Sequence, residues 1–201
     1  MNQVQTLVDD IARRHAEWTI RWHDTDMPPE RDLPWALVAQ NHRMNFSLWH
    51  EEDVARRDDL GADRVRQAKR AIDRFNQARN DAIERLDAWL LQQLPSARPD
   101  SPLHSETPGQ IMDRLSILAL KIYHMRIEAM RVSAPEEQRR QCAEKCAVLE
   151  EQLRDLKNCL QELLAQLQAG ARRFKIYRQF KMYNDAGLNP QLYAKAPAPA
   201  S

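Results

Sequence analysis

Apolar residues recur at alternating spacings of four and three positions from Cys142 to Leu167. Side chains at this spacing fall on one side of an α-helix, and a run of more than three heptads predicts one long helix with a coiled-coil type of seam. Such a helix can pack antiparallel inside a bundle or pair with a second copy of the chain. The seam consists of Cys142, Cys146, Leu149, Leu153, Leu156, Leu160, Leu163 and Leu167.

Helical periodicity also marks earlier segments, and the chain contains only 4 glycine residues. Apolar residues recur every three or four positions over about 3–22, 33–58 and 62–94, and again in a fourth segment beyond these. Glycine scarcity agrees with long helices, because sheets and loops need more turn residues. We therefore predict an all-α, single-domain bundle of about five helices over residues 1–193, followed by a disordered Ala/Pro tail over 194–201.

Short signatures predict where three of these helices begin. Thr107 is followed by a proline and then by Gln110, which is the spacing of a capping box. Ser133 and Glu136 have the same spacing ahead of the fifth helix. Asp32 is expected to cap the second helix.

Charge and hydropathy argue against several classes of partner. The net charge of +1 creates no global field that would gather nucleic acid or an anionic membrane, so nucleic-acid binding is not expected. No apolar run, residues 115–120 included, approaches the roughly 20 residues that cross a bilayer, and the first residues lack the apolar part of a signal peptide. We predict a cytoplasmic protein without membrane contact, with its three cysteines reduced.

Cations and aromatic side chains alternate over residues 172–183. This composition suits contact with phosphate or nucleic acid. It equally suits an amphipathic helix that docks its aromatic side on the bundle and leaves the cations in solvent. We favour the docked helix.

Ionisable side chains occur on helix faces that should be buried. The fourth helix is apolar on two sides, and Asp113 and His124 fall within the second of them. Arg79 lies in the middle of the apolar stripe of the third helix, and His42 lies within that of the second. Because burying an unpaired ionisable group costs several kcal/mol, these groups must pair or face a wet cavity.

Two interpretations of these groups remain open. A buried Arg–Asp pair with asparagine neighbours can fix the register of the helices without any further role. Alternatively, the groups form a polar pocket between helices, where bundles build ligand and metal sites. The His50-Glu-Glu-Asp53 segment permits a metal without requiring one, and the sequence identifies no cofactor and no common nucleotide or hydrolase motif.

Several motifs carry a family resemblance. They are the segments 48–53, 72–81, 106–118, 121–124, 177–185 and 188–190. In this order they are similar to the bacterial domain-of-unknown-function family 4254, and the resemblance covers about residues 35–193. The family has no established activity to carry over. The resemblance implies an association with glycosyltransferases and the assembly of cell-surface polysaccharide.

The motifs coincide with the misplaced polar residues, which predicts one polar pocket for an anionic ligand such as a sugar phosphate or a nucleotide sugar. Arg79, Arg114 and Lys121 are expected to hold the anion, since guanidinium forks match phosphate oxygens. The candidate acid–base residues are His50, Asp53, Asp113 and His124, and the candidate ligand-binding residues are Asp73, Asn76, Arg79, Asn80, Glu106, Arg114 and Lys121.

The alternative is a non-catalytic accessory or scaffold protein. In that case the seam over residues 142–167 forms a homodimer or binds a protein partner, and the buried polar groups only set the register. The sequence does not indicate whether the chain is an enzyme.

Overall fold

Five α-helices make up the protein in the computed structural model, which describes residues 3–25, 28–178 and 187–190. They are α1 (Gln3–Asp24), α2 (Trp35–Ala55), α3 (Ala62–Gln93), α4 (Pro108–Met130) and α5 (Glu136–Gln168), with a 3-10 turn η1 (Asp58–Leu60) between α2 and α3. The described residues contain no strand beyond an isolated bridge between Leu103 and Arg173. The predicted all-α bundle is confirmed.

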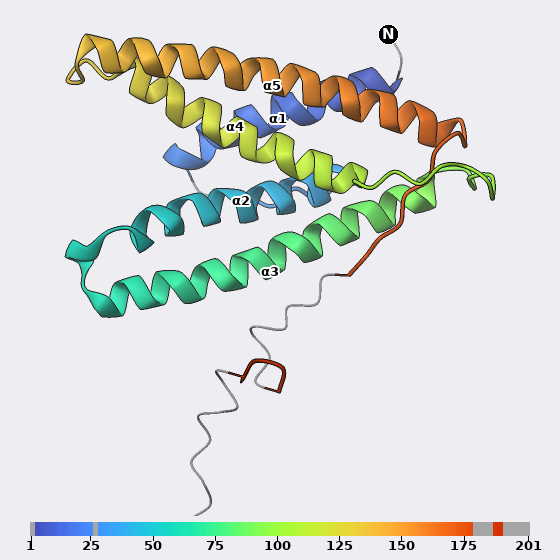
Figure 1. The fold of residues 1–201 in the computed structure, drawn as a ribbon, viewed down its shortest axis with the longest axis horizontal. Coiled ribbons are helices and arrows are strands. Elements are labelled where there is room, and N and C mark those ends of the chain that lie inside the picture. Colours follow the sequence, from blue (N-terminus) through green and yellow to red (C-terminus); the bar gives the residue numbers. More distant parts are fainter. Residues whose placement is uncertain (1–2, 26–27, 179–186, 191–201) are drawn as a thin grey trace, which may run out of the picture.

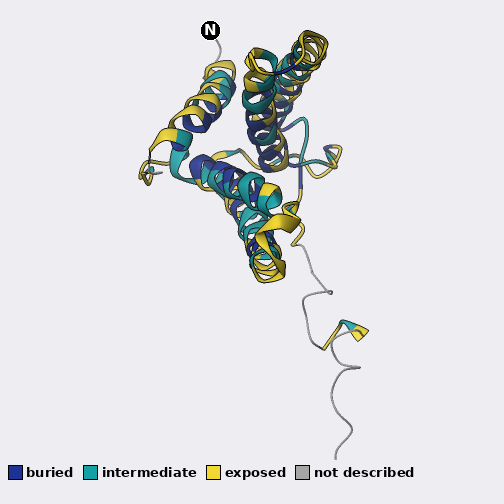
Figure 2. Ribbon diagram, turned by 90° about the vertical axis from the view of Figure 1, so that its left-hand side faces the viewer, coloured by how far each residue is buried: buried dark blue, intermediate teal, exposed yellow. Residues whose placement is uncertain are grey.

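Two helical hairpins and one separate helix form the bundle. Helices α2 and α3 pack antiparallel, as do α4 and α5, because short connections force consecutive helices to lie side by side. Helix α1 lies against α4, α5 and α2 (Figure 1). In the view along the helices, the buried residues of these three parts face one another (Figure 2). None of the described helices is long and apolar enough to cross a membrane.

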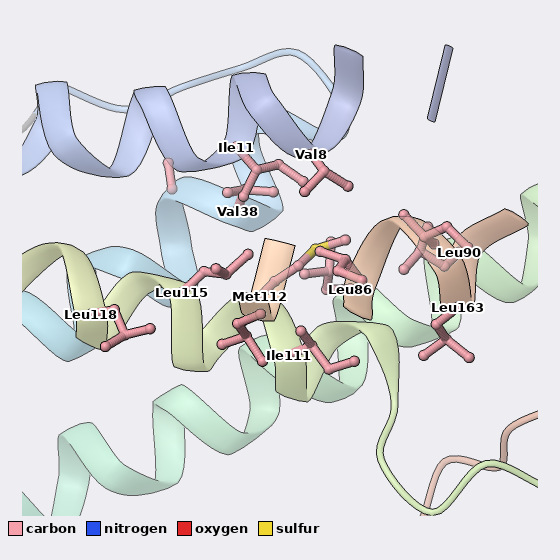
Figure 3. Close-up of a cluster of buried hydrophobic side chains, with 14 of the residues drawn as sticks. Val8, Ile11, Val38, Leu86, Leu90, Ile111, Met112, Leu115, Leu118 and Leu163 are labelled. Atoms are coloured by element: carbon pink, nitrogen blue, oxygen red, sulfur yellow. The ribbon is translucent and has the colours of Figure 1, made fainter. Parts of the chain in front are cut away.

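All five helices contribute to one hydrophobic core. Val8 and Ile11 of α1 meet Val38 of α2, and Leu86 of α3 and Leu115 of α4 belong to the same cluster (Figure 3). Several of these side chains are at most 1% exposed. Full burial of such a side chain stabilises the folded state by about 1.5–3 kcal/mol, so this core holds the three parts together.

The heptad seam packs inside the bundle over its C-terminal half. Leu156, Leu160, Leu163 and Leu167 are buried in the same core, on a helix that contacts α4 and α1. Toward the N-terminal end of the seam, Leu149 is only half-buried. The seam therefore takes the intramolecular arrangement, at least over its inner half.

Of the three predicted caps, one is confirmed and two are wrong. The Thr107 hydroxyl accepts from the Gln110 amide, and the Gln110 side chain accepts from the Thr107 amide. Helix α2 begins after Pro34 and α5 after Pro135, each without a side-chain cap. Asp32 instead turns the chain through its carbonyl, which accepts from the Ala36 amide at 2.8 Å. Ser133 lies inside a turn closed by the Ala134 amide, ahead of the proline.

The segment after α5 is extended, so the predicted amphipathic helix is wrong over residues 172–178. Gly170, with φ of 65°, turns the chain out of the helix. The Arg173 carbonyl then accepts from the His104 amide at 2.8 Å, and the Arg173 amide donates to the Pro102 carbonyl at 3.1 Å. This backbone pairing holds the segment extended, while Phe174 is buried in the core as its aromatic character suggested. Residues 179–183 and the predicted tail at 194–201 lie outside the described residues.

Candidate functional site

The polar residues expected to form one pocket are distributed over several neighbouring places. Asp113 and Arg79 belong to a buried network at the centre of the bundle. His50 and His124 belong to a cluster of rings between α1, α2 and α4. Most of the others line two cavities on either side of α4, and each place has its own chemistry.

The buried network converges on Asp113, which is 2% exposed. Its Oδ1 accepts from Arg79 Nε, Asn41 Nδ2 and Asn45 Nδ2, each at 2.8 Å. Its Oδ2 accepts from Arg79 Nη2, which completes a bidentate pair. Because partners from α2 and α3 occupy both oxygens, this carboxylate is suited to fixing the register of three helices, and a ligand finds no free oxygen there.

Two histidines extend the network toward α1. The His42 ring lies 2.7 Å from Ser116 Oγ through Nδ1 and 3.1 Å from Thr19 Oγ1 through Nε2. The His15 ring stacks on His42 at a centroid distance of 4.8 Å, and neither of its nitrogens has a hydrogen-bond partner among the described residues. Burial lowers the pKa of His15 to about 3 and that of His42 well below its ordinary value. Both rings are therefore neutral at pH 7.

Thr19, Asn41 and Ser116 were not singled out from the sequence. A signal was present for two of them, because Ser116 follows Asp113 by three positions and Asn41 precedes Asn45 by four. Side chains at these spacings share one helix face. The partners of a buried acidic residue can thus be sought at these spacings.

Three histidines from different helices form the ring cluster. The His23 ring lies 5.1 Å from His50 and 5.2 Å from His124, measured between centroids, and Trp49 stacks on His124 at 4.5 Å. Burial, with the neighbouring His23, lowers the pKa of His124 to about 4 and also lowers that of His50, against a smaller raising effect of Asp53. Both predicted acid–base histidines are thus neutral imidazoles at pH 7. Among the described residues, no three His, Cys, Asp or Glu side chains are placed to hold a metal ion.

A cavity of about 430 Å³ opens between α2, α3 and α4, and is called here the α2–α3–α4 cavity. Asp53 and Asn76 line it, and neither side chain has a hydrogen bond or ion pair to the described part of the chain. Arg79 lines it as well, with its guanidinium fixed by Asp113. Glu52 and Arg56 also line it and pair with each other at 3.0 Å.

A second cavity of about 570 Å³ lies between α4 and α5, and is called here the α4–α5 cavity. Arg114 and Lys121 line it from α4, and Glu106 pairs with Arg114 at 2.9 Å. Asp155 faces the same cavity from α5. Ile117 lines both cavities, so they adjoin across a ridge of α4.

Two of the predicted ligand-binding residues lie away from both cavities. Asp73 pairs with Lys69 one turn earlier on α3, at 3.7 Å. Asn80 lines a much smaller cavity of about 60 Å³ beneath the extended segment, together with Lys175 and Tyr177. The structure therefore brings neither residue to the cavity that Arg114 lines or to the cavity that Asp53 lines.

The start of α4 explains why a glycine stands at position 109. The buried Asp87 carboxylate accepts from the Gly109 amide at 2.7 Å and from the Thr107 hydroxyl. A Cβ on Gly109 would lie 2.8 Å from Asp87 Cγ, so a side chain there would displace the carboxylate. Burial raises the pKa of Asp87 to about 6 although both hydrogen bonds favour the ionised form. The Thr-Pro-Gly-Gln sequence thus supplies both a cap and space for the neighbouring helix.

The fold and these sites define a small all-α bundle with a partnered polar centre and two adjoining open cavities. The chain belongs to the family described as "Protein of unknown function (DUF4254)", whose model matches residues 35–176. The match begins at the first residue of α2, continues beyond the end of α5 and contains every predicted site residue. No curated protein and no solved structure matches the chain.

Proposed function

We propose that this protein binds a phosphorylated sugar, either a sugar phosphate or a nucleotide sugar, with the phosphate held by Arg114 and Lys121. The two residues are seven positions apart on α4, so they project from the same side of the helix two turns apart. The α4–α5 cavity beside them has a volume typical of sites for small molecules.

The observation that carries this proposal is the unused binding capacity of the two cations. Lys121 has no hydrogen bond or ion pair within the described part of the chain. Arg114 donates to Glu106 through Nη1, while its Nε and Nη2 have no such partner among the described residues. Charged donors with spare hydrogens form short, strong hydrogen bonds to phosphate oxygens. Arg79, which was expected to share this role, is instead committed to Asp113.

The remaining lining suits the organic part of such a ligand. Ile111, Leu118 and Leu156 contribute apolar side chains to the lining of the α4–α5 cavity. Asp155 has no hydrogen bond or ion pair to the described residues, and its carboxylate is an acceptor for a hydroxyl group rather than a neighbour for phosphate. The choice of a sugar follows the polysaccharide association that the family resemblance implies.

Isothermal titration calorimetry tests the proposal with glucose 1-phosphate, UDP-glucose, GDP-mannose and glucose itself. We expect the wild type to bind at least one phosphorylated ligand and to ignore glucose. Loss of a charged hydrogen bond is worth about 1.5–3 kcal/mol, so Arg114→Ala should weaken binding by about ten-fold or more.

Arg126→Ala is the matched control for Arg114→Ala. Arg126 lies on the same helix, has the same 56% exposed side chain, and pairs with Glu150 as Arg114 pairs with Glu106. It lines neither cavity, so its removal should leave the affinity unchanged. Absence of binding by the wild type, or equal binding by the two variants, would overturn the proposal.

The scaffold interpretation would use a surface that the bundle largely covers. Leu156, Leu160 and Leu163 are buried in the core of their own chain, so a partner helix can reach only the outer part of the seam around Cys142 and Leu149. Sedimentation of wild type and Leu149→Asp protein tests this alternative: a dimer that this substitution splits would support it.

A further inference from the structure

We infer that the α2–α3–α4 cavity is a second subsite, which binds a hydroxyl-rich, uncharged group attached to the phosphate held on the α4 ridge. This inference rests on the proposed function, since it extends the same ligand across α4. It makes the ligand bipartite, with an organic group on each side of a phosphate or diphosphate. A nucleotide sugar has this form, and a simple sugar phosphate does not.

Ile117 lies at the border between the two cavities. Ile117 lines both of them, and it lies between Arg114 and Lys121 on the same helix. A helix rises 1.5 Å per residue, so these two cations are about 10 Å apart along α4. A phosphate group bound between them therefore sits at the border of both cavities, with room for a substituent on either side.

The charged side chains that line the α2–α3–α4 cavity favour a neutral group over an anionic one. In the α2–α3–α4 cavity, Glu52 is paired with Arg56 and Arg79 is paired with Asp113. That leaves Asp53, an exposed carboxylate without an ion pair to the described residues. An unpaired carboxylate repels phosphate, so an anionic group is disfavoured on this side and a neutral one is accepted.

Three polar groups in the cavity match the hydrogen-bonding capacity of hydroxyls. The Asp53 carboxylate accepts from O–H groups, and the Asn76 amide can both donate and accept. Asn76 has no partner among the described residues that would have to be displaced. The guanidinium of Arg79 is held in one orientation by its two bonds to Asp113, so it is already ordered when a ligand arrives.

The rest of the cavity lining includes apolar side chains. Trp49, Leu48 and Leu120 are among them. Stacking on His124, at an interplanar angle of 4°, fixes the indole ring of Trp49. A pyranose ring presents C–H groups on its faces and hydroxyls around its edge. This cavity, lined by apolar side chains and a few hydrogen-bonding groups, has the composition typical of sites for such a molecule.

The experiment compares UDP with UDP-glucose, and GDP with GDP-mannose, by calorimetry on the full chain. We expect the wild type to bind a nucleotide sugar at least about ten-fold more tightly than its nucleotide, because two or more hydrogen bonds are added. Asn76→Ala and Asp53→Asn should remove most of this difference and leave the affinity for the nucleotide within about two-fold. Gln77→Ala is the control, since Gln77 is the exposed next residue of α3 and bonds to Asp81 instead.

The outcomes separate this inference from the proposed function. Equal affinities for nucleotide and nucleotide sugar in the wild type, or a nucleotide-sugar affinity unchanged in both Asn76→Ala and Asp53→Asn, overturn the second subsite and leave the phosphate site standing. The phosphate site and the second subsite are both supported if Arg114→Ala loses the nucleotide and the nucleotide sugar alike. In that case only Asn76→Ala and Asp53→Asn should lose the preference for the nucleotide sugar over the nucleotide. Urea unfolding of each variant confirms that it is folded before its affinity is interpreted.

Discussion

Asp113 and Asp53 differ in their surroundings, although Arg79 pairs with Asp113 and lines the same cavity as Asp53. Asp113 is buried and receives four hydrogen bonds from Arg79, Asn41 and Asn45. Asp53 is exposed at the α2–α3–α4 cavity and has no hydrogen bond or ion pair to the described residues. A carboxylate whose bonds are made inside the protein holds helices together, whereas one with open acceptors is available to a ligand. The comparison predicts opposite effects of mutation on stability and on binding.

Asp113→Ala should destabilise the folded protein strongly. Removing the carboxylate leaves Arg79 and the two asparagine amides without their partner in the middle of the bundle. Breaking a buried pair from one side costs about 3–5 kcal/mol, and urea unfolding measures this loss. A loss below about 1 kcal/mol would show that water replaces the carboxylate and that the network does not hold the helices.

Acid should destabilise the bundle through His15. Its folded pKa of about 3 lies below the ordinary value of 6.5, so between these two pH values the unfolded chain binds a proton that the folded chain does not. The contribution of His15 to the free energy of unfolding is fully present above pH 6.5. It falls as the pH is lowered, by up to about 1.4 kcal/mol per pH unit. His15→Leu should flatten the dependence of the unfolding free energy on pH between 6 and 4. An unchanged slope would contradict the burial of a neutral ring.

Gly109→Ala tests a second buried carboxylate, that of Asp87. The added Cβ would lie 2.8 Å from Asp87 Oδ1, and Asp87 is held in place by Thr107 and by the Gly109 amide. Such overpacking costs about 1–3 kcal/mol in thermal or urea unfolding. Adding Asp87→Ala should relieve the clash, so the double variant should lose less than the sum of the two single losses. Strict additivity would argue against the contact.

Asp53→Asn should leave the stability almost unchanged. A cavity-lining carboxylate without partners contributes little to the fold, so the unfolding free energy should change by less than about 0.5 kcal/mol. Asp113→Asn, measured beside it, should be clearly destabilising because an amide nitrogen would then face the Arg79 guanidinium. Equal losses in the two variants would remove the distinction on which the comparison rests.

Helix periodicity was sufficient to predict the number, order and approximate ends of the helices, because each depends on residues within a few turns of one another. The Thr107 capping box was found for the same reason. The caps expected from Asp32 and Ser133 were wrong because a proline occupies the N-cap position of each helix, and a proline side chain cannot accept a hydrogen bond. The extended segment at 172–178 was missed because its conformation depends on pairing with residues 102–104, about seventy positions earlier.

Helix phase alone was enough to place His42, Arg79 and Asp113 on apolar helix faces, because the spacing of the apolar residues around them defines those faces. Which of these groups meet is set by the packing of the helices. Asp113 and Arg114 are neighbours in the chain, yet successive residues of a helix point about 100° apart, so one enters the core and the other faces the α4–α5 cavity. Whether a polar group is paired or open depends on the helices packed around it, and that information is not local.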